Sequence, residues 1–236
     1  MIGILCALDR EIEELLSELE GAEHRELCGY DYAVGKLRGQ DVVLCKCGVG
    51  KVNAAVCAQT MILTWDAKLV INSGVAGALR EPFEIGDICV ATDLVQHDVD
   101  TTAIGDPPGL ISIVSKGEQV YFPCAKWAVD GMLAAAARLD GVRALPGRIA
   151  SGEQFVTARE VKERIVRTFD ASACEMEGGA IAQVCRINSV DCAVIRAISD
   201  SSSGRHQMEY QEFMPMAAHT SAQVVLEFLS NLKERR

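Results

Sequence analysis

The sequence predicts a single α/β domain in which a central, twisted, mixed sheet is flanked by helices. Three observations predict this fold class. Short apolar runs alternate with amphipathic stretches along the chain, a pattern typical of strands that alternate with helices. The 236 residues are 49% hydrophobic, which is enough for a sizeable core. No Gly/Ser/Pro-rich linker or change of composition divides the chain, so residues 1–236 are interpreted as one domain.

The N-terminal elements are read from their apolar patterns. Ile2–Ala7 is expected to be a buried strand, and Asp9–Leu16 begins a helix that carries acids in its first turn. Tyr32–Leu37 and Asp41–Cys47 are predicted to pair as a hairpin joined at Gly39 and Gln40. A helix is expected over Lys51–Thr64.

The middle of the chain predicts two strands and a long loop. Leu69–Asn72 is expected to be a strand that ends in Ser73–Gly77, whose glycines permit a tight turn and a close approach of backbone to a ligand. Ile88–Leu94 is the next strand. The segment Thr101–Glu118 is expected to be a loop, and loops of this length are commonly functional or interfacial.

The C-terminal half continues the alternation of helices and strands. The expected helices cover Ala125–Leu139, Ala158–Thr168, a segment that starts near Glu177, and Tyr210–Lys233. The expected strands are one ending at Arg148–Ala150, Ala173–Met176 and Cys192–Ile198.

Three acidic side chains follow predicted strands: Glu11, Glu177 and Asp200. In α/β sheets, ligands bind at the carboxyl ends of strands. Converging carboxyl groups suit cleavage of a glycosidic bond, in which an acid protonates the leaving group and a base activates water. Taken singly, Glu11 and Glu177 are equally well explained as helix N-terminal acids, and Asp200 as a turn cap.

The net charge of −10 argues against a nucleic-acid partner, because binding to phosphates needs clustered Lys and Arg. A small molecule is the expected partner. No apolar run approaches the roughly 20 residues that a membrane span needs. Met1 leads directly into the first strand without a basic leader, so we expect a cytoplasmic protein with no membrane partner.

Two local patterns are interpreted as structural. Gly48–Lys51 lacks the full phosphate-loop motif and is expected to be a tight turn between strand and helix. His97–Asp100 has no second His or Cys set at ligand spacing, so a hydrogen-bonded strand end is favoured over a metal site. No Cys-x-x-Cys occurs among the ten cysteines, and most lie among aliphatic residues, as buried structural thiols do. No metal or cofactor is expected.

Five ordered motifs across the chain resemble the bacterial 5′-methylthioadenosine/S-adenosylhomocysteine nucleosidases, of the purine nucleoside phosphorylase type I superfamily. They are Gly48–Val52, Asn72–Gly77, Ser151–Val156, Glu175–Glu177 and Arg196–Asp200. The resemblance covers essentially the whole chain. It implies the nucleoside phosphorylase-like fold, an adenine nucleoside as substrate, hydrolysis of its N-glycosidic bond, and a homodimer in which the Gln96–Leu110 region reaches across.

The resemblance also implies catalytic roles. Asp200 would be the general acid that protonates N7 of adenine, which typically contributes about 10²- to 10⁴-fold. A free aspartate has a pKa of about 3.9, so this role requires burial or ligand contact to keep the proton on the carboxyl group. Glu11 would be the base that deprotonates the attacking water, and Glu177 would bind the ribose hydroxyls.

The other implied contacts surround the base, the sugar and the 5′ substituent. Phe155 would stack on adenine, and base stacking of this kind is worth roughly 1–3 kcal/mol in nucleic-acid complexes. The Val156 backbone would read the base edge, and Met176 would pack beneath the ribose. The remaining implied substrate-binding residues are Gly77, Glu175 and Ser199, with Leu8, Val49 and Phe213 lining an apolar pocket for the 5′-thioalkyl group.

Two departures from the family leave the substrate open. Val75 stands where many relatives have Ser, and Ile104 stands where a neighbouring subunit often supplies an aromatic residue. Hydrolysis of aminodeoxyfutalosine is therefore an alternative. A phosphate-dependent phosphorylase is a weaker one, because the loop after the first strand presents Asp9 and Glu11 rather than cations. A non-catalytic nucleoside-binding protein is disfavoured by the retention of all three acids.

Overall fold

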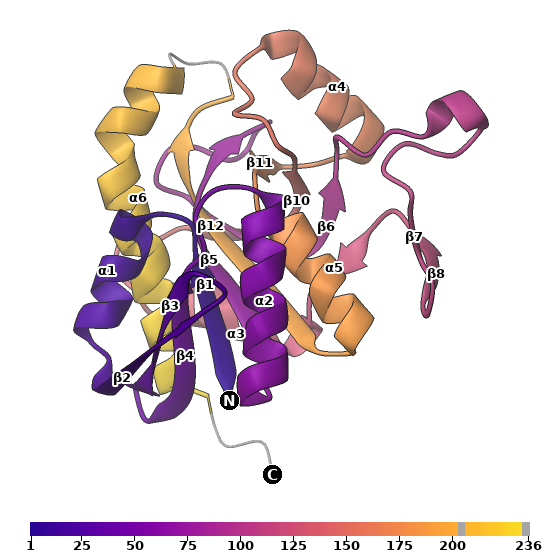
Figure 1. The fold of residues 1–236 in the computed structure, drawn as a ribbon. Coiled ribbons are helices and arrows are strands. Elements are labelled where there is room, and N and C mark those ends of the chain that lie inside the picture. The colour runs from indigo at the N-terminus through magenta and orange to yellow at the C-terminus, as the bar shows by residue number, and fades with distance from the viewer. Residues whose placement is uncertain (203–205, 233–236) are drawn as a thin grey trace.

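The structure is a computed structural model that describes residues 1–202 and 206–232. Its described strands form a ten-stranded mixed sheet and a separate two-stranded one (Figure 1). The main sheet runs in the order β11 (Ala173–Glu175), β10 (Ala144–Ser151), β6 (Ile88–Gln96), β12 (Asp191–Asp200), β5 (Leu69–Ala78), β1 (Ile2–Cys6), β4 (Gln40–Lys46), β3 (Tyr30–Leu37) and β2 (Glu20–Leu27).

One end of the main sheet closes on itself. β11 pairs in parallel with β10 and also antiparallel with β5, where Cys174 lies opposite Gly77. The pairing path β5–β12–β6–β10–β11 therefore returns to β5 as a ring. β9 (Phe122–Pro123) pairs with β6 outside this ring. The closure brings β11 and the carboxyl end of β12 beside the carboxyl end of β5, and the carboxyl end of β10 pairs with that of β11.

Helices cover both faces of the sheet. α2 (Lys51–Trp65) packs against α5 (Gly178–Asn188) on one side, while α6 (His206–Ser230) packs against α1 (Asp9–Ser17) and α3 (Lys126–Ala136) on the other (Figure 1). α4 (Arg159–Phe169) packs over the closed end through Ile165 and Phe169, which belong to one buried cluster with Val95, Ala150 and Cys174. The mixed sheet and its flanking helices confirm the predicted fold class.

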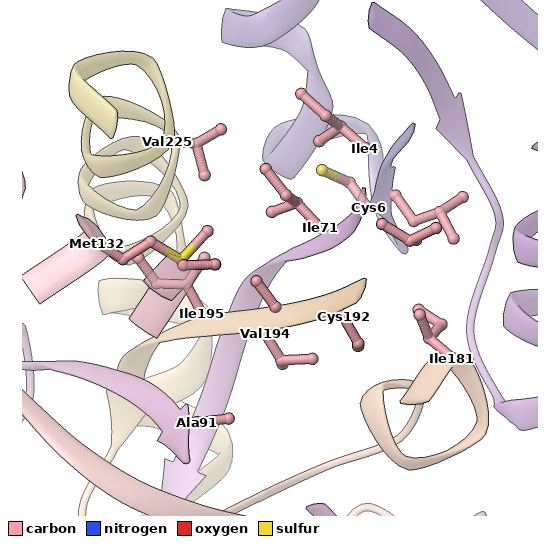
Figure 2. Close-up of a cluster of buried hydrophobic side chains, with 14 of the residues drawn as sticks. Ile4, Cys6, Ile71, Ala91, Met132, Ile181, Cys192, Val194, Ile195 and Val225 are labelled. Atoms are coloured by element: carbon pink, nitrogen blue, oxygen red, sulfur yellow. The ribbon is translucent and has the colours of Figure 1, made fainter. Parts of the chain in front are cut away.

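The main core lies between the sheet and these helices. Ile4, Ile71, Val194 and Ile195 are fully buried on the central strands (Figure 2). Met132 of α3, Val225 of α6 and Ile181 of α5 are also fully buried and belong to the same cluster. Six cysteines that lie among aliphatic residues in the sequence are buried and form no disulfide, as expected of structural thiols: Cys6, Cys57, Cys89, Cys174, Cys185 and Cys192. Burial of aliphatic side chains contributes about 1.5–3 kcal/mol each, so this cluster stabilises the strands that carry the site.

Most predicted elements are confirmed within a few residues, but the interpretation of Ser73–Gly77 as a turn is wrong. These residues continue β5, which stays paired with β12 from Leu69 to Gly77. At Gly74 and Gly77, neighbouring side chains occupy the space that a Cβ would need. These positions are glycine for that reason, and not because the chain turns. The helix expected to end at Lys233 ends at Ser230, and Lys233 lies outside the described residues.

The remaining differences concern connections. β2 was not expected, because its mostly exposed, polar sequence lacks an apolar alternation. The β3–β4 turn is at Arg38 and Gly39, one residue earlier than expected. Both have positive φ, as a two-residue type I′ turn requires. The expected loop over Thr101–Glu118 contains a short 3₁₀ helix, Thr102–Ile104, and most of the hairpin of β7 (Ile111–Ile113) and β8 (Gly117–Gln119). Within the described residues, no helix is long and apolar enough to cross a membrane.

Candidate active site

A cavity of about 320 Å³ opens where the ring of strands closes. Its walls come from β5, from the ends of β11 and β12, from the loops after β1, β4 and β10, and from α6. Eleven of the twelve residues that the family resemblance implies lie together on these walls: Leu8, Glu11, Val49, Gly77, Phe155, Val156, Glu175, Met176, Glu177, Ser199 and Asp200. The twelfth, Phe213, is not among the described lining residues.

Glu11 is held rigidly at the base of this cavity. It is the third residue of α1, and its Oε2 accepts hydrogen bonds from the backbone N–H groups of Ala7 and Leu8, each at 2.9 Å. Its Oε1 accepts a third from the N–H of Val75 at 3.0 Å. The side chain is 2% exposed, and this burial raises the pKa of Glu11 against the lowering effects of Arg196 and the three backbone donors.

Beneath the cavity, the fully buried Arg196 of β12 binds two carboxylates and one amide oxygen. Its Nη2 donates to Oε2 of Glu175, to the amide oxygen of Asn72 and, at 3.3 Å, to Oε2 of Glu177. Burial alone would lower the pKa of Arg196, but the charges of Glu175, Glu177 and Glu11 raise it above its ordinary value. A buried guanidinium is tolerated because this paired geometry compensates its desolvation.

Glu175 is fully engaged by the protein itself. Its Oε2 accepts hydrogen bonds from the N–H groups of Glu177 at 2.9 Å and Gly178 at 2.7 Å, in addition to the bond from Arg196. Its Oε1 accepts the hydroxyl of Ser151. The carboxylate therefore joins β10, β12 and the N-terminus of α5, where a negative charge is favourable.

Glu177 has more capacity to bind a ligand. Its Oε1 accepts the backbone N–H of Gly50 at 2.8 Å, and its Oε2 is the more distant partner of Arg196. Burial raises the pKa of Glu177 to about 7, and the opposing effect of Arg196 does not cancel this shift. The carboxyl group thus changes charge close to neutral pH.

Asp200 is the last residue of β12 and is 2% exposed. Its Oδ1 accepts the hydroxyl of Ser199 at 3.2 Å, and its Oδ2 lies 3.7 Å from Nζ of Lys162. A Cβ on Gly77 would lie 2.9 Å from the same Oδ2. The absence of a side chain at Gly77 therefore leaves room for the Asp200 carboxyl group.

Aromatic and aliphatic side chains form the outer wall. Phe155 is 53% exposed and makes an edge-to-face contact with Tyr210 of α6, with ring centroids 5.3 Å apart. Val49 and Leu8 lie across the opening. Tyr210 lines the cavity where Phe213 was expected. Phe213 lies three residues further along α6, about 4.5 Å along its axis, and is half-buried.

The turn before α2 braces the cavity wall. Gly48 and Gly50 have positive φ values of 79° and 100°, as expected of a tight strand-to-helix turn. The first N–H of α2, on Lys51, donates to Oε1 of Glu153 at 2.7 Å. The Lys51 ammonium pairs with Asp98 at 2.7 Å, and Asp98 also accepts the N–H of Glu153. These contacts join the loop after β4 to the loop that carries Phe155.

The same region contains His97, the first residue of the segment His97–Asp100 that was weighed as a metal site. His97 comes directly after β6, as expected of a strand end, but neither of its buried ring nitrogens has a hydrogen-bond partner among the described residues. Burial lowers its pKa, so the ring is held neutral. Across residues 1–202 and 206–232, no group of three His, Cys, Asp or Glu side chains is arranged to hold a metal ion.

Sequence reasoning assigned no role to three residues of the site, Arg196, Lys162 and Tyr210. Arg196 carried a signal, because an arginine inside the apolar run of β12 must be paired when buried. Lys162 carried none, since the charged segment of α4 looks like a solvated helix face. Tyr210 begins the expected last helix and was noted only as its first residue.

Comparisons with known proteins identify the family of this chain. The family model described as "Phosphorylase superfamily" matches residues 1–230. A 5′-methylthioadenosine/S-adenosylhomocysteine nucleosidase of Geobacillus kaustophilus is 35% identical over 99% of this chain and 98% of its own. An aminodeoxyfutalosine nucleosidase of Helicobacter pylori is 37% identical over 98% of this chain and 99% of its own.

A solved structure gives the same result. The 5′-methylthioadenosine/S-adenosylhomocysteine nucleosidase of Neisseria meningitidis, in complex with methylthio-immucillin-A, superposes with a TM-score of 0.92 at 33% identity. The alignment covers 98% of this chain and 99% of that one. The chain therefore belongs to the phosphorylase superfamily, and within it to the N-glycosyl hydrolases that act on adenine nucleosides, the group of the methylthioadenosine/adenosylhomocysteine nucleosidases and futalosine hydrolases.

Proposed function

We propose that this chain hydrolyses the N-glycosidic bond of 5′-methylthioadenosine and S-adenosylhomocysteine to give adenine and the corresponding thioribose. The observation that carries this proposal is the meeting of Glu11 and Asp200 in one largely apolar cavity. Both carboxyl groups are about 2% exposed, and they come from elements at opposite ends of the chain. A buried acid and a buried base facing one ligand space are what acid–base cleavage of a glycosidic bond needs.

Asp200 is the proposed general acid. It transfers its proton to N7 of adenine while the bonding electrons of C1′–N9 move to the base, which then leaves as neutral adenine. Burial favours the protonated form of a carboxyl group, which suits a proton donor. Ser199 fixes the orientation of the carboxyl group through Oδ1.

Glu11 is the proposed general base. It takes a proton from water as the water oxygen bonds to C1′, which carries positive character once adenine departs. The three backbone N–H donors and the charge of Arg196 favour the ionised form that this role requires. The same donors leave the carboxylate little rotational freedom, so it is already oriented before substrate binds.

The remaining contacts would bind the nucleoside. Glu177 would accept hydrogen bonds from the ribose hydroxyls, and Met176 would pack beneath the sugar. Phe155, backed by Tyr210, would stack on adenine beside the Val156 backbone. Leu8 and Val49 would contact the 5′-thioalkyl group, for which an apolar wall is required.

Water rather than phosphate as the nucleophile is supported by the charge of the cavity. Its described lining includes Glu11, Glu175, Glu177 and Asp200 but no lysine, arginine or histidine. Arg196 lies beneath the wall and is already bound by carboxylates. The negative charges of these side chains would repel a phosphate dianion.

Aminodeoxyfutalosine is a second candidate substrate, because the Helicobacter pylori nucleosidase for that compound is 37% identical to this chain. The two proposals share the chemistry at adenine and ribose and differ at the 5′ substituent. Steady-state kcat/KM values for methylthioadenosine, adenosylhomocysteine and aminodeoxyfutalosine, measured side by side, test the choice. A value for aminodeoxyfutalosine at least tenfold above the other two would overturn the first proposal.

We also propose a homodimer. The segment from η1 (Thr102–Ile104) to β8 projects from the body of the molecule (Figure 1). It carries Ile104, which is 80% exposed, and Val114, which is fully exposed. Large apolar side chains exposed together on one projecting segment are typical of an interface. A second copy of this chain is the proposed occupant.

A further inference from the structure

Lys162 of α4 is a buried lysine next to the proposed acid. It is 2% exposed, and its ammonium group donates to the carbonyl oxygens of Ala78 and Ser201, each at 3.0 Å. Ala78 ends β5, and Ser201 directly follows Asp200 at the end of β12. Burial of an ammonium group costs several kcal/mol unless hydrogen bonds and a counter-charge compensate it. Lys162 therefore occupies a position where charge has a strong local effect.

The Asp200 carboxyl group lies within ion-pair distance of this ammonium group, with its Oδ2 3.7 Å from the Lys162 Nζ and both side chains 3% exposed. Cys174 of β11 and Tyr210 of α6 are titratable groups that also face Asp200, and burial raises the pKa of each. Glu209 of α6 binds the N–H and hydroxyl of Ser201. The side chains of Arg80, Arg159 and Arg167 line the outer side of the same region with Lys162.

We propose that Lys162 is a positioning residue for Asp200. The fixed positive charge of Lys162 stabilises the carboxylate that forms when Asp200 gives up its proton. This inference rests on the proposed function. In the step concerned, the proton passes from Asp200 to N7, the C1′–N9 electron pair goes to adenine, and Asp200 becomes an anion. The hydrogen bonds to the two carbonyl oxygens hold the Lys162 ammonium group in place.

The charge of Lys162 acts in two opposite ways. It stabilises the product side of the proton transfer, because the new carboxylate stays buried within ion-pair distance of a cation. It also favours the ionised form of the Asp200 carboxyl group before substrate binds, because an opposite charge nearby stabilises a carboxylate. Removing the charge must therefore change both the rate and its pH dependence.

The test compares the pH profiles of adenine release for the full-length protein and for Lys162→Met. We expect the plateau of kcat to fall by about tenfold to a hundredfold, part of the roughly 10²- to 10⁴-fold that a general acid supplies. The alkaline limb of kcat/KM should move to higher pH by about one pH unit or more. An opposite charge at this distance changes the pKa of a carboxyl group by about that amount. Lys162→Arg keeps the charge and should keep the limb.

A purely structural role for Lys162 would predict a different outcome. Lys162→Met would then lower thermal stability or activity without moving the alkaline limb, and that result would overturn the proposal. Lys162→Gln, which can still donate to one carbonyl, repeats the test if the methionine variant does not fold. Arg159→Met on the exposed side of α4 is the matched control and should match the unmodified protein. If the unmodified protein itself releases no adenine, the proposed function fails instead.

Discussion

At the residue scale, the proposed chemistry depends on the proton of Asp200. Asp200→Asn keeps the shape of the side chain but removes the acidic proton. We expect kcat to fall by about 10²- to 10⁴-fold, the usual worth of a general acid, while nucleoside binding persists. Adenine release measured with calorimetric binding separates the two effects. Turnover near that of the unmodified protein would exclude the acid role.

Glu11→Gln tests the base. The amide cannot take a proton from water, and its NH₂ group would face backbone N–H donors that now bind a carboxylate oxygen. We expect loss of turnover together with a loss of about 1–3 kcal/mol in the free energy of unfolding, because buried donors lose an acceptor. Denaturant unfolding and adenine release would measure both. Full activity in the glutamine variant would contradict a base at this position.

The raised pKa of Glu177 makes nucleoside binding depend on pH. Glu177 titrates at about 7 in the folded protein, so its carboxylate form is present above this pH and is lost as pH falls. Because the charged form is the proposed ribose acceptor, the affinity for a non-hydrolysable adenine nucleoside should weaken as pH falls from about 8 to 6. Glu177→Gln should bind weakly at both pH values. An affinity of the unmodified protein that does not change over this range would argue against the assigned role.

Individual residues also show which parts of the site could be predicted from the sequence and which could not. The acids of the site followed from the family resemblance, and the cavity brings them together as expected from strand ends. Lys162 could not be found this way, because its burial depends on how α4 packs over the closed end of the sheet. Arg196 begins one of the five motifs, yet its partners come from two other segments, Asn72 of β5 and the motif Glu175–Glu177, which only the folded chain brings together with it.

At the element scale, β5 shows how a local cue fails. Its glycines suggested a turn, but pairing with β12 along this segment and with β11 at Gly77 keeps the strand extended. The glycines serve packing, since a Cβ at Gly74 would lie 2.3 Å from Nη1 of Arg196 and 2.5 Å from Oε1 of Glu11. The alternation of apolar runs was a sufficient signal for most strands and helices because they are buried on the sheet. It failed for β2, which is exposed.

This packing predicts that Gly74→Ala is severely damaging. The added methyl group would force the buried Arg196 and Glu11 side chains apart, and we expect a loss of more than about 3 kcal/mol in stability, typical of a broken buried charge network. Ser73→Ala in the same strand is the control. It removes only the hydroxyl contact with Ser221 and should cost about 0.5–1.5 kcal/mol. Thermal unfolding of both variants gives the comparison, and equal losses would refute the packing argument.

At the scale of the whole molecule, the closed end of the sheet and the helix layers position the cavity, whereas the side chains of Ile104 and Val114 on the projecting segment are left exposed. The proposed dimer would cover them. Sedimentation or light scattering should show a mass of two chains, and Ile104→Asp together with Val114→Asp should shift the mass toward one chain. A monomer at micromolar concentration for the unmodified protein would contradict the proposal.

The central claim is that this molecule uses water to release adenine from a 5′-thioadenosine. The most direct measurement incubates the purified protein with methylthioadenosine in phosphate-free buffer and follows free adenine. We expect adenine and methylthioribose in equal amounts, at a rate that added phosphate does not change. Adenine that appears only after phosphate is added, with a sugar phosphate as the second product, would contradict it.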